Sequence, residues 1–523
     1  MNLSFDLDAR LGVALAVARS GAARATSRTW HKGRALWSLA VMCAAGLGVL
    51  AAGCSLAPEF TRPALPVADE YPTDAPMPTV AKPDAPTAAE LAWRDYFADQ
   101  QLQAMIAQAL EENRDLRVAV LRVQEARAAF QIRRADQFPT LNANAGELRL
   151  GVPADVSQTG SARTLPAYYV GLSVVGWELD FWGRVSNLKD AALEQYLASD
   201  DARRAVTVSL VAQVADGYFT LRELDERIRI TRDTIRTREE SLRLFKRRFE
   251  VGTTTRLDVA QVETLLTQAQ SLGAQLEQAR AAQAHALTLL MGTQPAGLED
   301  RANLNDAEPM HELRVGLPSE LLQERPDIIA AEHLLRGANA NIGAARAAFF
   351  PSITLTGFFG TASAELDSLF DSGTKAWLFA PQLVLPIFDA GRRQANLDLA
   401  EVRRDVAVAG YERTIQTAFR EVSDALSAQR WLGEQVAIQR RGLAAQQERA
   451  RLAQMRYDRG SATFLEVLDA QRDLLTAEQQ LVQLRRALLS SRVALYAALG
   501  GGSQHYGEPP APSSRYDAQQ AKQ

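Results

Sequence analysis

"MRYDRGSATFLEVLDAQRDLL", residues 455–475, contains the end of one helix pattern, a glycine and the start of another helix pattern. A similar stretch, "KRRFEVGTTTRLDVAQVETLL", occupies residues 246–266. The turn glycines, Gly252 and Gly460, lie 208 positions apart. Glycine where a helix stops supplies the left-handed backbone conformation of a helix C-terminus. We therefore predict two helix hairpins with tips near residues 252 and 460.

Each turn is followed by a possible helix cap. Thr255-Arg-Leu-Asp258 and Thr463-Phe-Leu-Glu466 have the pattern of a capping box, in which Thr and the acidic side chain satisfy the first free N–H groups of the helix. The pattern favours a capping role for Asp258 and Glu466, although a functional role for these acids stays open.

A charged face follows the second turn. Asp469, Arg472 and Asp473 are spaced three and four residues apart, so a helix places them on one face. The first copy has other residues at these positions, namely Gln261, Thr264 and Leu265. Two interpretations remain: a solvated face with a salt bridge, or an acidic ring around a constriction if several chains assemble about one axis.

The duplication extends over most of the chain. We assign residues 91–315 to a first structural repeat and 316–500 to a second, each with a helix, a strand pair and a long helix hairpin. Residues 184–250 and 392–456 contain no proline, and helices of this length would be about 100 Å long. Ordinary coiled-coil hairpins share this pattern, so it predicts long helix hairpins but does not indicate their function.

The strand pairs have the length of membrane-crossing strands. The pairs expected are 139–149 with 168–179, and 351–361 with 376–388. Strands of about ten residues suit a tilted membrane span, and aromatic residues near their ends suit the interfaces. A soluble four-stranded sheet is the alternative. Four strands cannot close a barrel, and open edges are excluded from lipid, so membrane strands would require several chains to share one barrel.

The N-terminal region predicts export and lipid attachment. A basic flank and an apolar run precede Cys54, so residues 1–53 are assigned as a signal peptide, with one long transmembrane anchor as the alternative. Cys54 after small residues resembles a bacterial lipobox, where the cysteine is lipidated, and Ser55 implies sorting to the outer membrane. The proline-rich segment 54–90 predicts an extended tether. The polar residues 501–523 predict a disordered tail.

Composition excludes several function classes. The chain of 523 residues has a net charge of −4, and the acidic excess argues against a nucleic-acid partner. Its two cysteines are Cys43, inside the predicted signal peptide, and Cys54, so neither a disulfide nor a cysteine nucleophile is expected. No nucleotide-binding, hydrolase or metal-binding motif occurs. The sequence predicts no catalytic residue, no metal site and no cofactor except covalent lipid on Cys54.

Five segments together resemble one known family, the TolC-like outer membrane factors, in their OprM/NodT lipoprotein branch. These are "WRDYFADQQLQAMIAQALEENRDL" (93–116), "WELDFWGR" (177–184), "GLPSELLQERPDI" (316–328), "LVLPIFDAGRRQANL" (383–397) and "RYDRGSATFLEVLDAQRDLL" (456–475). The resemblance implies a membrane β-barrel plus an all-α tunnel. A homotrimer would form a 12-stranded barrel, four strands per chain, in the cell outer membrane, with coiled-coil helices in the periplasm.

The resemblance also implies a function, partners and a site. It implies the exit duct of a tripartite efflux system, passively conducting small toxic compounds, with a periplasmic adaptor docked on the hairpin tips and an inner-membrane pump of RND type. By motif position, Asp469 and Arg472 match an aperture pair, and Asp473 and Glu466 are assigned to the same aperture. Tyr457 and Asp258 match a lock between the tips. The tip arginine of some members is Ala462 here.

Three alternatives to the efflux duct are kept. They are a duct for type I protein secretion, a periplasmic adaptor or structural coiled-coil lipoprotein, and, more distantly, an enzyme.

Overall fold

A computed structural model describes residues 55–71, 86–155, 160–294, 304, 310–311, 313–314 and 318–507. The predicted signal peptide, Cys54 and residues 508–523 of the predicted tail lie outside the described residues. Within Ser55–Gln523 the elements follow one another in two similar series. The first series is α2 (Trp93–Tyr96), α3 (Gln100–Glu112), α4 (Arg114–Ala135), β1 (Leu141–Val152), β2 (Arg163–Leu179), α5 (Arg184–Glu250) and α6 (Arg256–Met291). The second is α7 (Leu321–Glu324), α8 (Pro326–Ala347), β3 (Ser352–Ser363), β4 (Lys375–Val384), α9 (Arg392–Asp458), α10 (Phe464–Ala498) and η3 (Ser503–His505).

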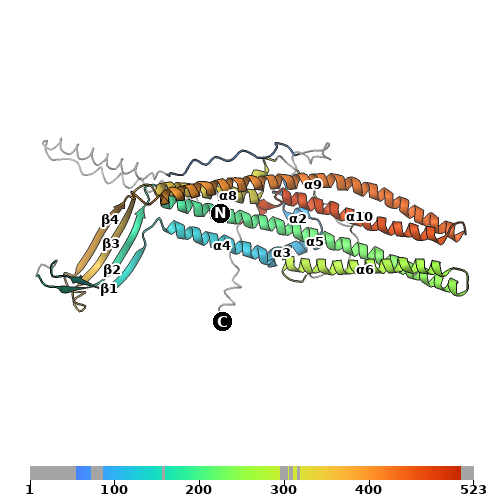
Figure 1. Cartoon of the computed structure of the whole chain (residues 1–523), viewed down its shortest axis with the longest axis horizontal. Helices are drawn as coiled ribbons and strands as arrows, with labels where there is room; N and C mark the ends of the chain where they lie inside the picture. The colour runs from blue at the N-terminus through green and yellow to red at the C-terminus, as the bar shows by residue number, and fades with distance from the viewer. Residues whose placement is uncertain are drawn as a thin grey trace, which may run out of the picture. The chain divides into compact units, whose positions relative to one another are not determined.

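The four strands form one antiparallel sheet in the order β1-β2-β3-β4. The central pair, β2 and β3, comes from different repeats, so the sheet joins the two halves of the chain (Figure 1). Gly176, with φ of +63°, lies in the bulge that shifts the β2–β3 register between Val174 and Trp177. Within the described residues β1 and β4 each have one free edge.

The strand register separates two chemically different faces. One face is mainly apolar and carries Leu141, Leu172, Val174, Trp177, Leu355, Phe359, Trp377, Phe379 and Leu383. The opposite face is mainly small and polar and carries Asn142, Asn144, Gly171, Ser173, Thr354, Thr356, Ala380 and Gln382. Many of the apolar side chains are exposed, including Trp377 at 72%. A sheet divided in this way suits lipid on one side and water on the other.

The strand ends differ most from the sequence expectation at two places. β2 begins at Arg163, five residues earlier than expected, because residues 163–167 continue to pair with β1. β4 ends at Val384, and the expected extension to residue 388 is wrong. Pro386 interrupts that extension because it has no backbone N–H to donate to a strand partner.

Two long helix hairpins extend from the sheet. α5 and α9 are each 67 residues long and begin directly after left-handed glycines, Gly183 and Gly391. α4 and α8 pack beside them in the half near the sheet, and α6 and α10 return along them in the half near the tips (Figure 1). Among the described residues, no helix is both long enough and apolar enough to cross a membrane.

The main hydrophobic core lies where the helices of the half near the sheet meet those of the half near the tips. Tyr96 and Tyr496 stack with ring centroids 4.2 Å apart, and Tyr218 and Tyr411 are also almost fully buried. The expectation of disorder from residue 501 onward is wrong for residues 501–507. Gly501 lies against the Tyr496 ring, where a Cβ would come within 2.3 Å of it, and Gly502 donates its N–H to the Ala88 carbonyl at 2.8 Å. Glycine at these positions allows the backbone to pack tightly.

Residues 55–71 are extended, as the prolines predict, and they lie against the helices. Arg62 forms an ion pair with the buried Glu332 of α8 at 2.9 Å, and Asn339 of α8 donates to the Pro58 carbonyl at 2.7 Å. Tyr71 stacks on Phe419 of α9 with centroids 5.2 Å apart. The segment, which we call the strap, is therefore fixed along its length and is more than a spacer.

Candidate functional site

The two hairpin tips share one backbone design. Gly252 and Gly460 have φ of +76° and +72°. After α5, the N–H of Thr253 binds the Arg248 carbonyl and the N–H of Gly252 binds the Phe249 carbonyl, both at 2.9 Å. The second tip has the same two bonds, from Ser461 to Arg456 and from Gly460 to Tyr457. This is the Schellman pattern, and both glycines have the role that the sequence predicts.

The first tip is closed by a complete capping box. The Thr255 hydroxyl accepts from the N–H of Asp258, and the Asp258 carboxylate accepts from the N–H and hydroxyl of Thr255. Thr254 adds a third donor at 2.9 Å. Donation by the Thr255 side chain, then by its backbone, and then by Thr254 lowers the pKa of Asp258 below its ordinary value. Asp258 therefore acts as a structural cap.

The second tip lacks this arrangement, and the predicted cap by Glu466 is wrong. Among the described residues, the Thr463 side chain makes no capping hydrogen bond. The Glu466 carboxylate instead forms an ion pair with Arg456 of α9, with 2.6 Å between the charged atoms. The longer glutamate side chain reaches the basic residue across the turn and not its own N-cap. Glu466 thus joins α9 to α10 at the tip.

The predicted lock between Tyr457 and Asp258 does not form in this structure. Asp258 is already bound by Thr254 and Thr255, and the Tyr457 hydroxyl accepts from Arg248 of α5. Tyr457 also packs against Phe464, which lies 4.2 Å from Phe245 of α5 by ring centroids. The two tips are therefore linked by Arg248 and an aromatic cluster. The sequence marks Arg248 because it is repeated as Arg456 in the second copy. The repetition does not show that Arg248 binds Tyr457.

The charged face of α10 forms as the spacing predicts. Arg472 is 3.2 Å from Asp469 and 3.2 Å from Asp473. Arg449 of α9, which the sequence analysis missed, is 2.6 Å from Asp473. Its hydrogen bond, supported by Arg472, lowers the pKa of Asp473 below the ordinary value. Asp469 and Arg472 are 42% and 54% exposed, so these groups are accessible to a neighbouring chain or to solutes.

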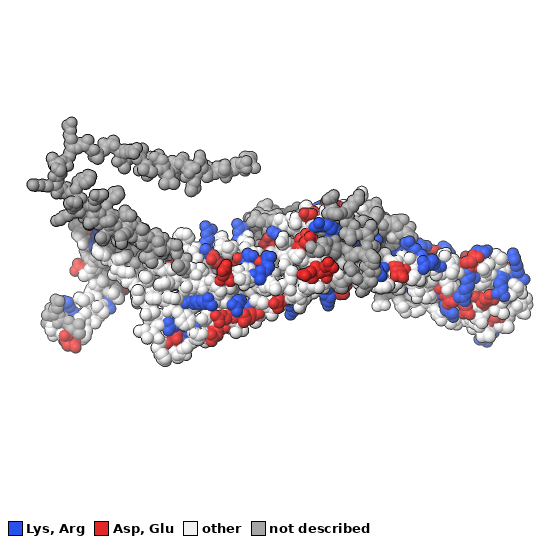
Figure 2. Space-filling view, turned by 90° about the horizontal axis from the view of Figure 1, so that it is seen from above, with Lys and Arg blue, Asp and Glu red and all other residues white. Residues whose placement is uncertain are grey.

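Charge of both signs gathers at the tip end of the hairpins, as Figure 2 shows. Three ion pairs connect the four residues Arg449, Asp469, Arg472 and Asp473. We call these four residues the aperture cluster. Among the described residues, no group of three or more His, Cys, Asp or Glu side chains could hold a metal ion. The chemistry available at the tips is therefore electrostatic and apolar contact.

Comparison with known proteins places this geometry among channels. The profile of the family "Outer membrane efflux protein" matches residues 105–293 and 317–501. The probable efflux pump outer membrane protein TtgC of Pseudomonas putida is 46% identical over 451 residues, covering 86% of this chain and 93% of TtgC. The outer membrane protein OprJ of Pseudomonas aeruginosa is 43% identical over 450 residues, covering 86% of this chain and 93% of OprJ.

Solved structures agree with the sequence relatives. The Neisseria gonorrhoeae MtrE outer membrane channel in its open state superposes with a TM-score of 0.77 at 38% identity, covering 86% of this chain and 98% of MtrE. A membrane protein from Pseudomonas aeruginosa gives a TM-score of 0.79 at 42% identity, with 86% and 98% coverage. The residues that the family profile matches include all four strands and both hairpins.

Proposed function

The chain belongs to the outer membrane efflux protein family and is an outer-membrane exit channel of a tripartite efflux system, and we propose that its cargo is small toxic compounds. Relatives that are 46% identical include a toluene efflux pump protein and an antibiotic efflux pump protein of Pseudomonas putida. These names support small organic cargo over the protein cargo of type I secretion.

The observation that carries the channel function is the sheet with two free edges. Four strands per chain leave β1 and β4 unpaired on their outer sides within the described residues. Unpaired backbone groups are excluded from lipid, so the edges of neighbouring copies must pair. Three chains make a 12-stranded barrel, and the long helices continue it as a tunnel in the periplasm. A coiled-coil adaptor needs no such sheet, so the adaptor alternative is wrong.

A periplasmic adaptor and an inner-membrane pump of RND type complete the proposed assembly. The tips present exposed apolar side chains beside the turn glycines: Val251 is 69% exposed, Leu257 66% and Leu465 49%. Exposed apolar residues next to a rigid turn suit a protein partner. We assign the docking surface for the adaptor to the tips around Gly252 and Gly460. The channel is proposed to be passive, without catalytic residues or cofactors, since the pump supplies the energy.

The aperture cluster is proposed as the gate. Asp469, Arg472 and Asp473 repeat three times around the trimer axis. Glu466 joins α10 to α9 through Arg456, and Tyr457 links the second hairpin to the first through Arg248. Breaking exposed ion pairs costs little free energy, so a docked adaptor can open such a closure.

Lipid on Cys54 is proposed to anchor the chain. Ser55, the first described residue, hydrogen bonds to Asn187 at 3.0 Å, and Asn187 lies in the first turn of α5, close to the end of β2. This position suits a cysteine whose acyl chains enter the inner leaflet around the barrel. Substitution Cys54→Ala should abolish incorporation of labelled fatty acid, and continued labelling would refute the anchor.

Three measurements test the proposed function. The protein extracted in detergent should have the mass of three chains and should conduct ions in planar bilayers; a monodisperse monomer would contradict the shared barrel. Deleting the gene from its host should raise sensitivity to small toxic compounds. Unchanged sensitivity together with a lost secreted protein would favour type I secretion.

A further inference from the structure

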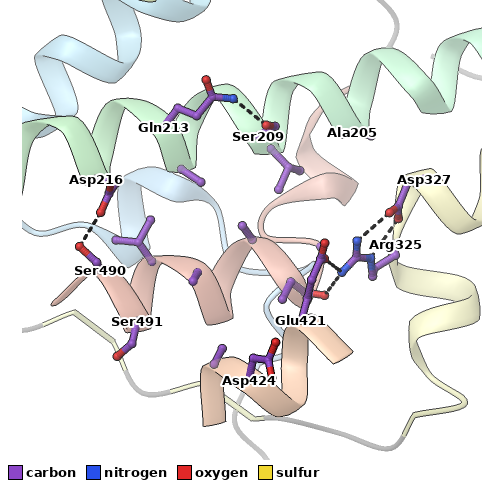
Figure 3. Close-up of a pocket in the computed structure, with 18 of the residues that line it drawn as sticks. Ala205, Ser209, Gln213, Asp216, Arg325, Asp327, Glu421, Asp424, Ser490 and Ser491 are labelled. Atoms are coloured by element: carbon purple, nitrogen blue, oxygen red, sulfur yellow. Dashed lines mark hydrogen bonds and ion pairs between the residues drawn. The ribbon is translucent and has the colours of Figure 1, made fainter. Parts of the chain in front are cut away.

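A cavity of about 740 Å³ lies where α8 and α10 meet, between α5 and α9 (Figure 3). Its floor consists of small apolar side chains from three helices, including Ala205, Ala212, Ala425, Ala428, Ala494 and Ala497. This volume falls in the range of cavities that hold drug-sized molecules. We call it the seam cavity.

One end of the seam cavity is closed by tight packing between the C-terminus of α10 and the N-terminus of α8. Gly500 follows α10 and packs against the Glu324 carbonyl, where a Cβ would come within 2.6 Å. Arg325, which is almost buried, binds Asp327 at 2.6 Å, Glu421 of α9 at 2.8 Å and the Ala498 carbonyl at 2.8 Å. Figure 3 shows the Arg325 side chain between these two carboxylates. The guanidinium ties three helices together, so the cavity is built into the fold.

The rim of the seam cavity is acidic. Arg325 is engaged with Asp327 and Glu421, while Asp216 of α5 and Asp424 of α9 also line the cavity. Their side chains are 50% and 74% exposed. The nearest cationic nitrogens, from Arg486 and Arg420, are each 3.9 Å away, and Ser490 donates a hydrogen bond to Asp216. Two accessible carboxylates therefore stand above an apolar floor.

The contacts of α8 indicate on which side of the tunnel wall the cavity opens. The strap contacts α8 at Glu332, Arg336, Asn339 and Gly343. A second groove, of about 470 Å³, contacts α8 at Leu334, Ala338, Asn341 and Ala345. The two sets have the same spacing but are offset by two residues, which is about 200° around a helix. The groove therefore lies on the face opposite the strap.

The seam cavity continues the face of this groove. The groove contacts α9 at Asn396, Leu399, Ala400 and Arg403, and the cavity contacts α9 at Glu421, Asp424, Ala425 and Ala428. Each residue of the second set follows its counterpart by 25 positions, which is about seven helical turns. Both hollows thus lie on one face of α9. Because a strap that leads from the proposed lipid anchor at Cys54 must run outside the barrel, the opposite face lines the inside of the tunnel.

We propose that the seam cavity is a cargo-binding site inside the duct for amphipathic organic cations. The class consists of molecules with an apolar body and one positive charge, such as lipophilic ammonium or phosphonium ions. The apolar body contacts the alanine floor and the charge lies beside Asp216 and Asp424, which is the complementarity that the cavity offers. The inference rests on the proposed function, because it needs small cargo within the tunnel.

Binding of rhodamine 6G, a fluorescent amphipathic cation, to the detergent-solubilised trimer tests the site by fluorescence polarisation. Combining Asp216→Asn with Asp424→Asn should weaken binding about fivefold, since each exposed charge contributes modestly. Ala428→Leu, which fills the floor without changing charge, should weaken it as well. The matched control is Asp405→Asn, an exposed carboxylate on α9 outside the cavity, which should leave binding unchanged.

Competition identifies the chemistry of the ligand. Tetraphenylphosphonium should displace rhodamine 6G, whereas tetramethylammonium, which lacks an apolar body, and the anion tetraphenylborate should not. Binding that survives both the charge and the filling variants overturns the site. Absence of binding in a trimer that conducts ions overturns the site and leaves the duct intact. A trimer that binds rhodamine 6G but never conducts supports the site and contradicts the duct.

Discussion

The first hairpin, α5 with α6, and the second, α9 with α10, have nearly the same backbone and are held in different ways. α5 and α9 have equal lengths, and both end in a Schellman turn at a left-handed glycine. Within one chain, α5 buries far more of its residues than α9 does, because α4, α6, α8 and α10 all pack against it. The first tip has a capping box, whereas exposed ion pairs join α9 to α10 near the second tip.

This difference shows what a duplicated sequence can keep and what it can change. The glycine turns and helix lengths maintain the geometry of the tunnel wall in both copies. The side chains determine how firmly each copy is fixed, because buried packing contributes more stability than exposed charge pairs do. We propose that the first hairpin is the fixed part of the wall and that the second hairpin moves when the aperture opens.

The largest expected difference concerns one glycine inside each long helix. A Cβ on Gly217 of α5 would come within 2.7 Å of the Leu287 side chain, whereas Gly433 of α9 has open space around its Cβ position. Gly217→Leu should destabilise the protein by about 2–3 kcal/mol through overpacking. Gly433→Leu should have little effect. Thermal unfolding of the purified trimers measures both, and equal losses would remove the distinction between the hairpins.

The next effect concerns the aperture cluster. Replacing both Asp469 and Arg472 with Ala should free the second hairpin and increase channel opening about fivefold, which corresponds to about 1 kcal/mol of exposed ion pairing. Single-channel recording in planar bilayers measures the change. The matched control replaces Gln261 and Thr264, the equivalent positions of the first hairpin, with Ala. Opening that responds equally to both double variants would show that the gate does not lie in the second hairpin.

A smaller effect is expected at the helix caps. Thr255→Ala removes half of a formed capping box and should cost about 1 kcal/mol. Among the described residues, the Thr463 hydroxyl makes no capping hydrogen bond. Thr463→Ala should therefore lower the stability by only a few tenths of about 1 kcal/mol. The midpoints of thermal unfolding should rank the two variants in this order. The reverse order would mean that the second tip depends on a cap after all.

The smallest effect is a response to acid. Arg449 and Arg472 lower the pKa of Asp473, so the ionised carboxylate stabilises the closed cluster above the ordinary aspartate pKa. This contribution is lost as the pH falls through the lower pKa of the folded state. Conductance should therefore increase only in strong acid, below about pH 4, and Asp473→Asn should reduce that increase. An unaltered acid response in Asp473→Asn would assign it to other groups.

Local signals in the sequence account for much of this architecture. Gly252 and Gly460, the proline-free helices and the alternating strands all act through nearest neighbours, so their roles could be predicted from short stretches. The partners of Tyr457 and Glu466 could not, because each depends on which arginine of another helix comes within reach. Arg449 and the packing of residues 501–507 were missed for the same reason: their contacts are made between different elements, which no short stretch contains.

The central claim is that the second hairpin opens while the first stays in place. Spin labels at Leu257→Cys and Leu465→Cys test it directly, since these exposed residues occupy equivalent positions beside the two tips. Distances between the three identical labels of a trimer are measured by pulsed electron resonance, with and without the Asp469→Ala and Arg472→Ala substitutions. The account predicts longer distances between labels at 465 and unchanged distances between labels at 257. Equal lengthening at both sites, or lengthening at 257 alone, would contradict it.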